Sequence, residues 1–166
     1  MAISEPDFYV AGEFYDPARE PELYAGVLGR RMLAFIVDVV LIGVFDVIAA
    51  LVVVALGLVT FGVGWFLFAL PLFAIVGVLY VALTLGGPKA ATPGMRLMGL
   101  TIRASDGSRI GPILAGIHVI LYWASISLLT PFILLIALFS NRKRLLHDML
   151  IGAVVLNRAP LQATGR

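Results

Sequence analysis

The chain has 166 residues, of which 61% are hydrophobic and 13% charged, whereas soluble domains are about half apolar and about a quarter charged. It has no cysteine, which excludes disulfides and thiolate metal sites, and its net charge of +2 comes without the basic, aromatic-rich stripe of a nucleic-acid-binding protein. The apolar residues fall into three long blocks, Leu33–Val59, Trp65–Leu85 and Ile110–Phe139, which predict an all-α integral membrane protein held in the lipid bilayer.

Residues 1–24 form an acidic tail that carries six of the ten acidic residues of the chain and a single basic residue, Arg19. The segment has no helical period, and its composition is typical of a disordered cytoplasmic tail. Its repeated acid–aromatic pattern offers an alternative, in which the tail docks on the basic remainder of the chain. The membrane domain is predicted to cover residues 25–158, followed by a short C-terminal tail at 159–166.

Two full transmembrane helices are predicted, from about Arg31 to Leu58 and from about Trp65 to Leu85. Each offers the roughly 20 apolar residues that a helix needs to cross a hydrocarbon core. The uncharged stretch GLVTFGVG contains three glycines and is predicted to form the turn between them. Pro71 lies inside the second helix and is expected to kink it.

The polar region that follows the second span is predicted to form a small cytoplasmic module. Thr92 and Pro93 have the pattern of an N-cap followed by proline at the first helical position. The Asp-Gly pair in LTIRASDGSRI indicates a β-hairpin turn. We therefore expect a small sheet made of Leu100–Ala104, Ser108–Ile110 and Gly152–Asn157.

The third apolar block is long for one span and short for two. Its roughly 30 residues would run about 45 Å as one helix, against a hydrocarbon core of about 30 Å. Lysine and arginine mark cytoplasmic loops, and basic residues flank both ends of the block. A re-entrant or broken helix pair, with its break in SISLLTP, places both ends inside. The alternative, which violates the charge rule, is an interfacial helix to about Tyr122 followed by one span.

Two aspartates lie inside the first predicted span, where insertion of a central aspartate costs about 2.5–3.5 kcal/mol. Asp38 lies on the same helix face as Arg31, about 10 Å along the axis. It is either part of an ion pair that locks the helix to the C-terminal segment or a ligand for a substrate or ion. Asp46 lies about 12 Å deeper, and because burial favours a neutral carboxyl group, a hydrogen-bonded acid is preferred over an ion site. Arg30 is expected to anchor the helix at the interface.

His147 and Asp148 are adjacent, but neighbouring residues on a helix or strand point apart, and no serine nucleophile motif accompanies them. A cap or salt bridge at the membrane edge is the favoured interpretation. A metal site would require His118, His147 and aspartates to converge from distant segments, and no ligand spacing indicates this. Without a nucleophile elbow, metal motif or phosphate loop, we expect neither an enzyme nor a bound cofactor.

Taken together, these features resemble the RDD family of bacterial membrane proteins, which is named for one arginine and two aspartates. The matching residues are Arg31 and Asp38 in RRMLAFIVD and Asp148 in RLLHDMLIGAVVL. The stretch TPGMRLMGLTIRASDG is similar to the loop between spans in the family. The resemblance covers about residues 24–158 and leaves out most of the acidic tail.

The chain departs from the family pattern at several positions. Family members usually have lysine at the position of Met95, and several carry an arginine in the segment around His118. The threonine often found at the position of Ala153 is missing. Asp46 lies outside the name-giving trio, so the resemblance implies an architecture more than a shared substrate.

The resemblance implies transport, since some family members look like cation/proton antiporters. It also implies that the chain returns to the cytoplasmic side after the third block, and we expect Arg31 to lie there between Asp38 and Asp148. The residues with a secondary role in this site are expected to be Arg30, Asp46, Arg96, His118 and His147.

The leading hypothesis is a small multi-pass transporter or ion-translocating protein of the bacterial inner membrane, with its N-terminus in the cytoplasm. So few spans seldom enclose a pathway alone, so a homo-oligomer is expected. Asp38, together with Asp46, would exchange a proton or cation or bind a small molecule, and Arg31 would hold or release Asp38. The rival hypothesis is a non-transporting scaffold or accessory subunit whose acidic tail recruits a partner.

Overall fold

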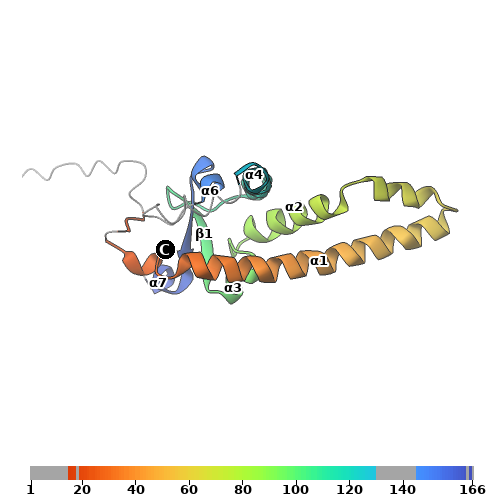
Figure 1. Ribbon diagram of the computed structural model, residues 1–166. Coiled ribbons are helices and arrows are strands. Elements are labelled where there is room, and N and C mark those ends of the chain that lie inside the picture. The colour runs from red at the N-terminus through yellow and green to blue at the C-terminus, as the bar shows by residue number, and fades with distance from the viewer. Residues whose placement is uncertain (1–14, 18, 130–144, 164, 166) are drawn as a thin grey trace, which may run out of the picture.

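The computed structural model describes residues 15–17, 19–129, 145–163 and 165 of the chain. Two apolar segments extend side by side from a polar end, where the short helices and a small sheet gather (Figure 1). The elements in chain order are η1 (Pro21–Leu23), α1 (Val27–Val59), η2 (Val63–Ala69), α2 (Leu72–Leu85), α3 (Pro93–Leu97), β1 (Leu100–Ala104), α4 (Pro112–Leu129), α6 (Leu146–Leu150), β2 (Ala153–Asn157) and α7 (Arg158–Ala163).

Helix α1 is the longest described element, and most of its large apolar side chains face outward. Its 33 residues rise about 50 Å at 1.5 Å per residue, which exceeds a hydrocarbon core of about 30 Å. Val40, Leu51 and Leu58 are each more than 60% exposed. A helix of this length and composition can cross a bilayer, and its apolar outer surface suits lipid better than water.

The second apolar segment is a bent pair of helices. The axes of η2 and α2 differ by 74°, and the break falls at Leu70 and Pro71. Proline has no N–H for the helical ladder and fixes its own φ, which accounts for a break here. By length and composition, the described residues hold one candidate span, α1, or two if this bent pair counts as one.

Two glycines let η2 approach α1 closely. A Cβ atom on Gly64 would lie 2.6 Å from the backbone nitrogen of Gly57, and one on Gly57 would overlap the indole ring of Trp65. The indole nitrogen of Trp65 donates to the carbonyl of Val54 at 3.3 Å. The glycines that indicated a turn in the sequence therefore also permit the packing of the two segments at this end.

The small sheet is formed by strands that lie far apart in the sequence. Strands β1 and β2 pair antiparallel, with a register that runs from Leu100 opposite Asn157 to Ala104 opposite Ala153. All five residues of β2 are buried. The sheet contributes to a hydrophobic core at the polar end. This core consists of Val27, Leu85, Ala90, Leu100, Ile102, Ile110, Ala115, Ala153 and Val155.

The predicted β-hairpin is wrong, because Ser108–Ile110 is not a strand. The Asp-Gly turn does form, with the backbone nitrogen of Ser108 bound to the Asp106 carboxylate at 2.9 Å. The chain then places Ile110 in the core and starts α4 at Pro112, which leaves only the four residues 108–111 between the turn and the helix. The β-branched run of β2 supplies five pairing positions and takes the place beside β1.

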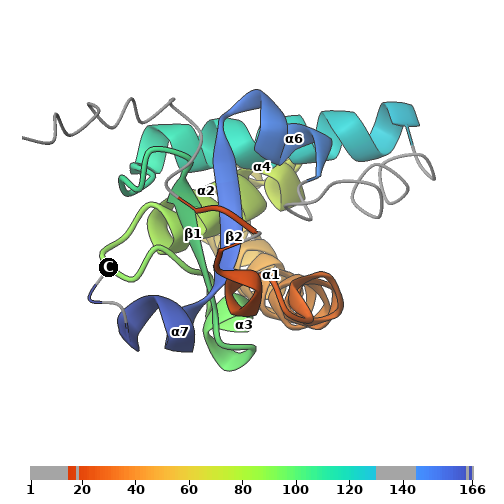
Figure 2. The same cartoon turned by 90° about the vertical axis from the view of Figure 1, so that its left-hand side faces the viewer.

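Helix α4, the first part of the third apolar block, crosses over α2 (Figure 2). The ring of Trp123 stacks on Phe73 at a centroid distance of 5.5 Å. A Cβ atom on Gly77 would lie 3.0 Å from the Trp123 ring, so the absence of a side chain there makes room for the crossing. The choice between a re-entrant pair and a single span depends on residues 130–144 and lies outside the described residues.

The described part of the acidic tail packs against the C-terminal elements. Tyr15, Leu23 and Tyr24 are buried, and the hydroxyl of Tyr24 donates to the carbonyl of Tyr15 at 2.9 Å. Their partners in this second core are Val154, Leu156 and Leu161, from β2 and α7. This segment therefore adopts the docking alternative, whereas residues 1–14 lie outside the described part of the chain.

Candidate functional site

A buried ion pair joins the start of α1 to α6 through two residues, Arg31 and Asp148, that lie 117 positions apart in the sequence. A guanidinium nitrogen of Arg31 lies 2.5 Å from Oδ2 of Asp148, whose side chain is fully buried. The backbone nitrogen of Leu145 donates to the same oxygen at 3.0 Å, so Asp148 also caps the first turn of α6. The pairing of Arg31 with Asp148 and the capping interpretation of Asp148 both match this geometry.

The arginine decides the charge state of Asp148. Burial alone would raise the pKa of this carboxyl group, but the charge and hydrogen bond of Arg31, with smaller contributions from His147 and His118, outweigh burial and lower the pKa to about 2. Asp148 is therefore ionised at neutral pH. A paired, ionised carboxylate at this position holds α1 and α6 together. Loss of either partner would leave the charge of the other unpaired in a region of low dielectric.

Asp38 is held by three donors from α2 and the segment around α3. It accepts hydrogen bonds from the Tyr80 hydroxyl at 2.6 Å, the Thr92 hydroxyl at 2.5 Å and the backbone nitrogen of Gly94 at 2.8 Å. Thr92 in turn accepts from the backbone nitrogen of Met95, which confirms the predicted N-cap of α3. Asp38 thus fixes the loop after α2 to the inner face of α1.

The expected arrangement of Arg31 between two aspartates is not present. Among the described residues, the ion pair of Arg31 is with Asp148, whereas Asp38 is bound by neutral donors. Arg31 lies in the first turns of α1 and contacts α6, whereas Asp38 lies about two turns further along α1 and contacts α2 and the start of α3. Sequence reasoning missed Tyr80 and Gly94 as partners of Asp38; the Thr92-Pro93 capping signal was the one indication that a helix start lay nearby.

Asp46 lies deeper along α1 and is not satisfied in the same way. Its side chain is half-buried, and its buried Oδ1 has no hydrogen-bond partner among the described residues. The adjacent Phe45, Val47 and Ile48 are about half or more exposed, as expected for a lipid-facing stretch. Within the first apolar block, Asp46 is therefore the acid whose bonding the described fold leaves incomplete.

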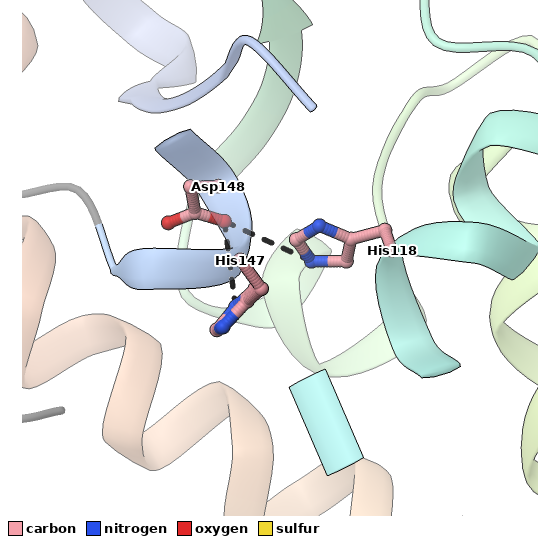
Figure 3. Close-up of side chains that lie close together, drawn as sticks. All are labelled: His118, His147 and Asp148. Atoms are coloured by element: carbon pink, nitrogen blue, oxygen red, sulfur yellow. Dashed lines mark ion pairs between the residues drawn. The ribbon is translucent and has the colours of Figure 1, made fainter. Parts of the chain in front are cut away.

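Both histidines of the chain converge on the remaining oxygen of Asp148 (Figure 3). Oδ1 of Asp148 lies 3.5 Å from Nε2 of His147 and 3.8 Å from Nε2 of His118. The two imidazole rings meet edge to face at a centroid distance of 4.8 Å, and the Tyr122 ring lies 5.1 Å from that of His147. The expectation that His147 and Asp148 point apart is therefore wrong, because the imidazole ring lies back over the carboxylate of its neighbour.

No spacing in the sequence indicated this convergence, since His118 belongs to α4 and His147 to α6. Burial lowers the pKa of His147 to about 4, and the nearby carboxylate of Asp148 offsets this only in part. The imidazole is therefore neutral at neutral pH, so one of its ring nitrogens carries a free lone pair.

The other two predicted arginines contact backbone or amide oxygens instead of the acids. Arg30 donates to the side-chain oxygen of Asn157 at 3.1 Å, which ties the start of α1 to the end of β2. Arg96 donates to the carbonyl of Ala91 at 3.1 Å. Both residues lie at the polar end, yet neither touches Asp38 or Asp148 among the described contacts.

Comparison with known proteins gives one match. The sequence model of the RDD family matches residues 25–152, which include Arg31, Asp38 and Asp148 and make up more than half of the chain. No curated protein and no solved structure matches. The chain belongs to the RDD family.

Proposed function

We propose that this protein moves protons or cations across the bacterial inner membrane as a homo-oligomer, with Asp46 as the group that exchanges the ion. Membership of the RDD family and the apolar helix α1 indicate a membrane protein. The transported species and the oligomer are part of the proposal. In this scheme the protein catalyses no covalent reaction and needs no cofactor.

The observation that carries the proposal is the incomplete bonding of Asp46. An aspartate near the middle of a membrane helix costs about 2.5–3.5 kcal/mol, so such residues commonly face a cavity, pair with another group or bind an ion. Asp46 has a buried oxygen without a partner in the described part of the chain. A proton, a cation or a polar group of a neighbouring copy would satisfy it.

Asp38 is a weaker candidate for ion exchange than the sequence suggested. Three hydrogen bonds already occupy its two oxygens, and they hold α1, α2 and α3 in place. Release of Asp38 during transport would break the contact of all three elements. We therefore assign Asp38, Arg31 and Asp148 to the framework of the polar end, and Asp46 to the ion.

The charge distribution supports a cytoplasmic polar end. Arg30, Arg31, Arg96 and Arg103 all lie at the end with the sheet, whereas the turn between α1 and η2 carries no charge. Because lysine and arginine are enriched in cytoplasmic loops, this distribution favours an orientation with the N-terminus inside and the turn outside.

The test is ion flux in proteoliposomes that contain the full chain or its Asp46→Asn variant. We expect Asp46→Asn to reduce proton-coupled cation flux to the level of empty liposomes, with normal insertion and folding. Asp106→Asn, which removes an exposed acid outside the spans, is the matched control and should retain flux. Asp38→Asn should lower the yield of folded protein. Flux that persists unchanged in Asp46→Asn would refute the assignment.

The second candidate is a membrane scaffold, and the packing of residues 15–24 favours it. Tyr15, Leu23 and Tyr24 pack the described part of the acidic tail against β2 and α7. A scaffold would show no flux above empty liposomes in the unmodified chain. It would also lose a binding partner, but not membrane insertion, when residues 1–13 are deleted.

A further inference from the structure

The cluster of His118, His147 and Asp148 has no part in the ion exchange proposed above, in which Asp148 serves only the framework. The chain has only two histidines, which lie 29 positions apart in the sequence, and the fold brings both to one carboxylate. The three potential ligand atoms all lie within 4.8 Å of one another. His147 and Asp148 are at most 1% exposed.

The distances in the cluster are too long for hydrogen bonds. Oδ1 lies 3.5 Å from one Nε2 atom and 3.8 Å from the other. Both distances exceed the usual donor–acceptor distance of about 2.7–3.2 Å in an N–H···O hydrogen bond. Oδ1 of Asp148 is buried and has no hydrogen-bond partner among the described residues. A buried carboxylate oxygen without a donor is costly, and such an atom indicates a missing positive or donating group.

The same distances suit a metal ion between the three atoms. Zinc binds imidazole nitrogen and carboxylate oxygen at about 2.0–2.2 Å, so neighbouring ligand atoms of a tetrahedral site lie about 3.4 Å apart. The two separations from Oδ1 to the Nε2 atoms need a contraction of only about 0.1–0.4 Å. The two imidazole nitrogens, which lie within 4.8 Å of each other, would have to approach by at most about 1.4 Å. Two imidazoles and one carboxylate form a donor set that favours transition metals such as zinc over calcium or magnesium.

We propose that Nε2 of His118, Nε2 of His147 and Oδ1 of Asp148 bind one divalent transition-metal ion, with zinc as the best fit. Water completes the fourth position. The site would join α4 to α6 at the polar end of the molecule. Because the metal site does not include Asp46, a test of the site is independent of the proposed ion pathway.

Groups around the cluster orient its carboxylate ligand. Arg31 and the backbone nitrogen of Leu145 bind Oδ2, which leaves Oδ1 directed at the histidines. Second-shell partners of this kind fix ligand orientation in metal sites. The positive charge of Arg31 also opposes a cation nearby, so the affinity should be lower than in a site without it. His118 is 12% exposed at its side chain, which offers the ion a route of entry.

The test is zinc binding by the full chain in detergent, purified without a histidine tag and stripped with a chelator. Equilibrium dialysis should give one zinc ion per chain. His118→Gln and His147→Gln should each weaken binding by at least about tenfold, the lower limit for loss of even an outer-shell partner. Asp106→Asn is the matched control, because it removes an exposed acid and should bind zinc like the unmodified chain.

A second measurement covers the possibility that a histidine variant does not fold. X-ray absorption of the zinc-loaded, unmodified chain should show scattering from two imidazole ligands. A shell of oxygen ligands alone would overturn the proposal. Unchanged zinc affinity in folded His118→Gln and His147→Gln, or far less than one zinc ion per unmodified chain, would do the same.

Discussion

At the scale of single residues, the ion pair of Arg31 and Asp148 carries the largest energetic consequence. Asp148 is fully buried, and Arg31 is the charged group that binds its Oδ2. Removal of one partner of a buried pair costs about 3–5 kcal/mol, because the other charge is left without compensation. Arg31→Met should therefore lower the free energy of unfolding by about 3 kcal/mol, measured by denaturation with sodium dodecyl sulfate in mixed micelles.

The double variant Arg31→Met with Asp148→Asn separates the loss of a pair from the loss of packing. It leaves no unpaired buried charge, so it should be more stable than Arg31→Met alone. Arg103→Met is the matched control, since the described contacts of Arg103 are to the Thr101 hydroxyl and a backbone carbonyl. Equal stability of Arg31→Met and Arg103→Met would show that the pair contributes little.

The residues of this site differ in how far the sequence predicted them. The sequence favours a cap or salt bridge at the membrane edge for His147 and Asp148, and the family resemblance implies the pairing of Asp148 with Arg31. The partners of Asp38 and the convergence of the histidines did not follow. Those contacts depend on how α2, α4 and α6 pack around α1, and no local pattern encodes a contact between segments so far apart.

At the scale of elements, the contact between α3 and α1 depends on a single glycine. A Cβ atom on Gly94 would overlap the carbonyl oxygen of Ala34 and come within 2.8 Å of the Asp38 carboxylate. Because the obstacle is backbone, α3 would have to move and would weaken the hydrogen bond from Gly94 to Asp38. Gly94→Ala should therefore destabilise the protein by about 1–3 kcal/mol, the usual range for overpacking.

Gly29→Ala is the matched control for this change. Gly29 lies in α1, and a Cβ atom there would meet nothing within 4 Å. Alanine favours a helix over glycine by about 0.5–1 kcal/mol, so Gly29→Ala should leave the free energy of unfolding unchanged or raise it slightly. If both variants unfold alike in the same detergent titration, the close contact of α3 with α1 does not stabilise the fold.

The elements themselves were predicted in proportion to the strength of their local signals. The long apolar run gave α1 within a few residues of each end, and proline gave the break between η2 and α2. Of the three predicted strands, Leu100–Ala104 and Gly152–Asn157 are confirmed as β1 and, to within one residue, β2. The strand at Ser108–Ile110 is wrong, because the Asp-Gly signal specifies a turn but not that a strand follows it. Strand β2 lies about fifty positions from β1, and its pairing depends on the fold of everything between them.

At the scale of the whole molecule, charge and apolarity are separated along the length of α1. The sheet, the ion pair and the described arginines lie at one end, and the uncharged turn after Val59 lies at the other (Figure 1). With α1 across the bilayer, these two ends face different compartments. The orientation proposed above then makes a prediction that labelling can check.

The chain has no cysteine, so single cysteines can report the side of the membrane without further changes. Phe61→Cys lies in the uncharged turn and Ser108→Cys in the turn after β1, and both native side chains are exposed. A membrane-impermeant maleimide added to intact spheroplasts should label Phe61→Cys. Ser108→Cys should react only after lysis, because the proposed orientation, which follows the enrichment of lysine and arginine in cytoplasmic loops, puts its end of the protein in the cytoplasm.

The cysteine-free parent should take up no label before or after lysis, which sets the background. The opposite pattern, with Ser108→Cys labelled from outside, would reverse the orientation but keep α1 as a span. Labelling of both positions from the same side would mean that α1 does not cross the bilayer. Asp46 would then lie outside hydrocarbon, and the reason for assigning it an ion would be lost.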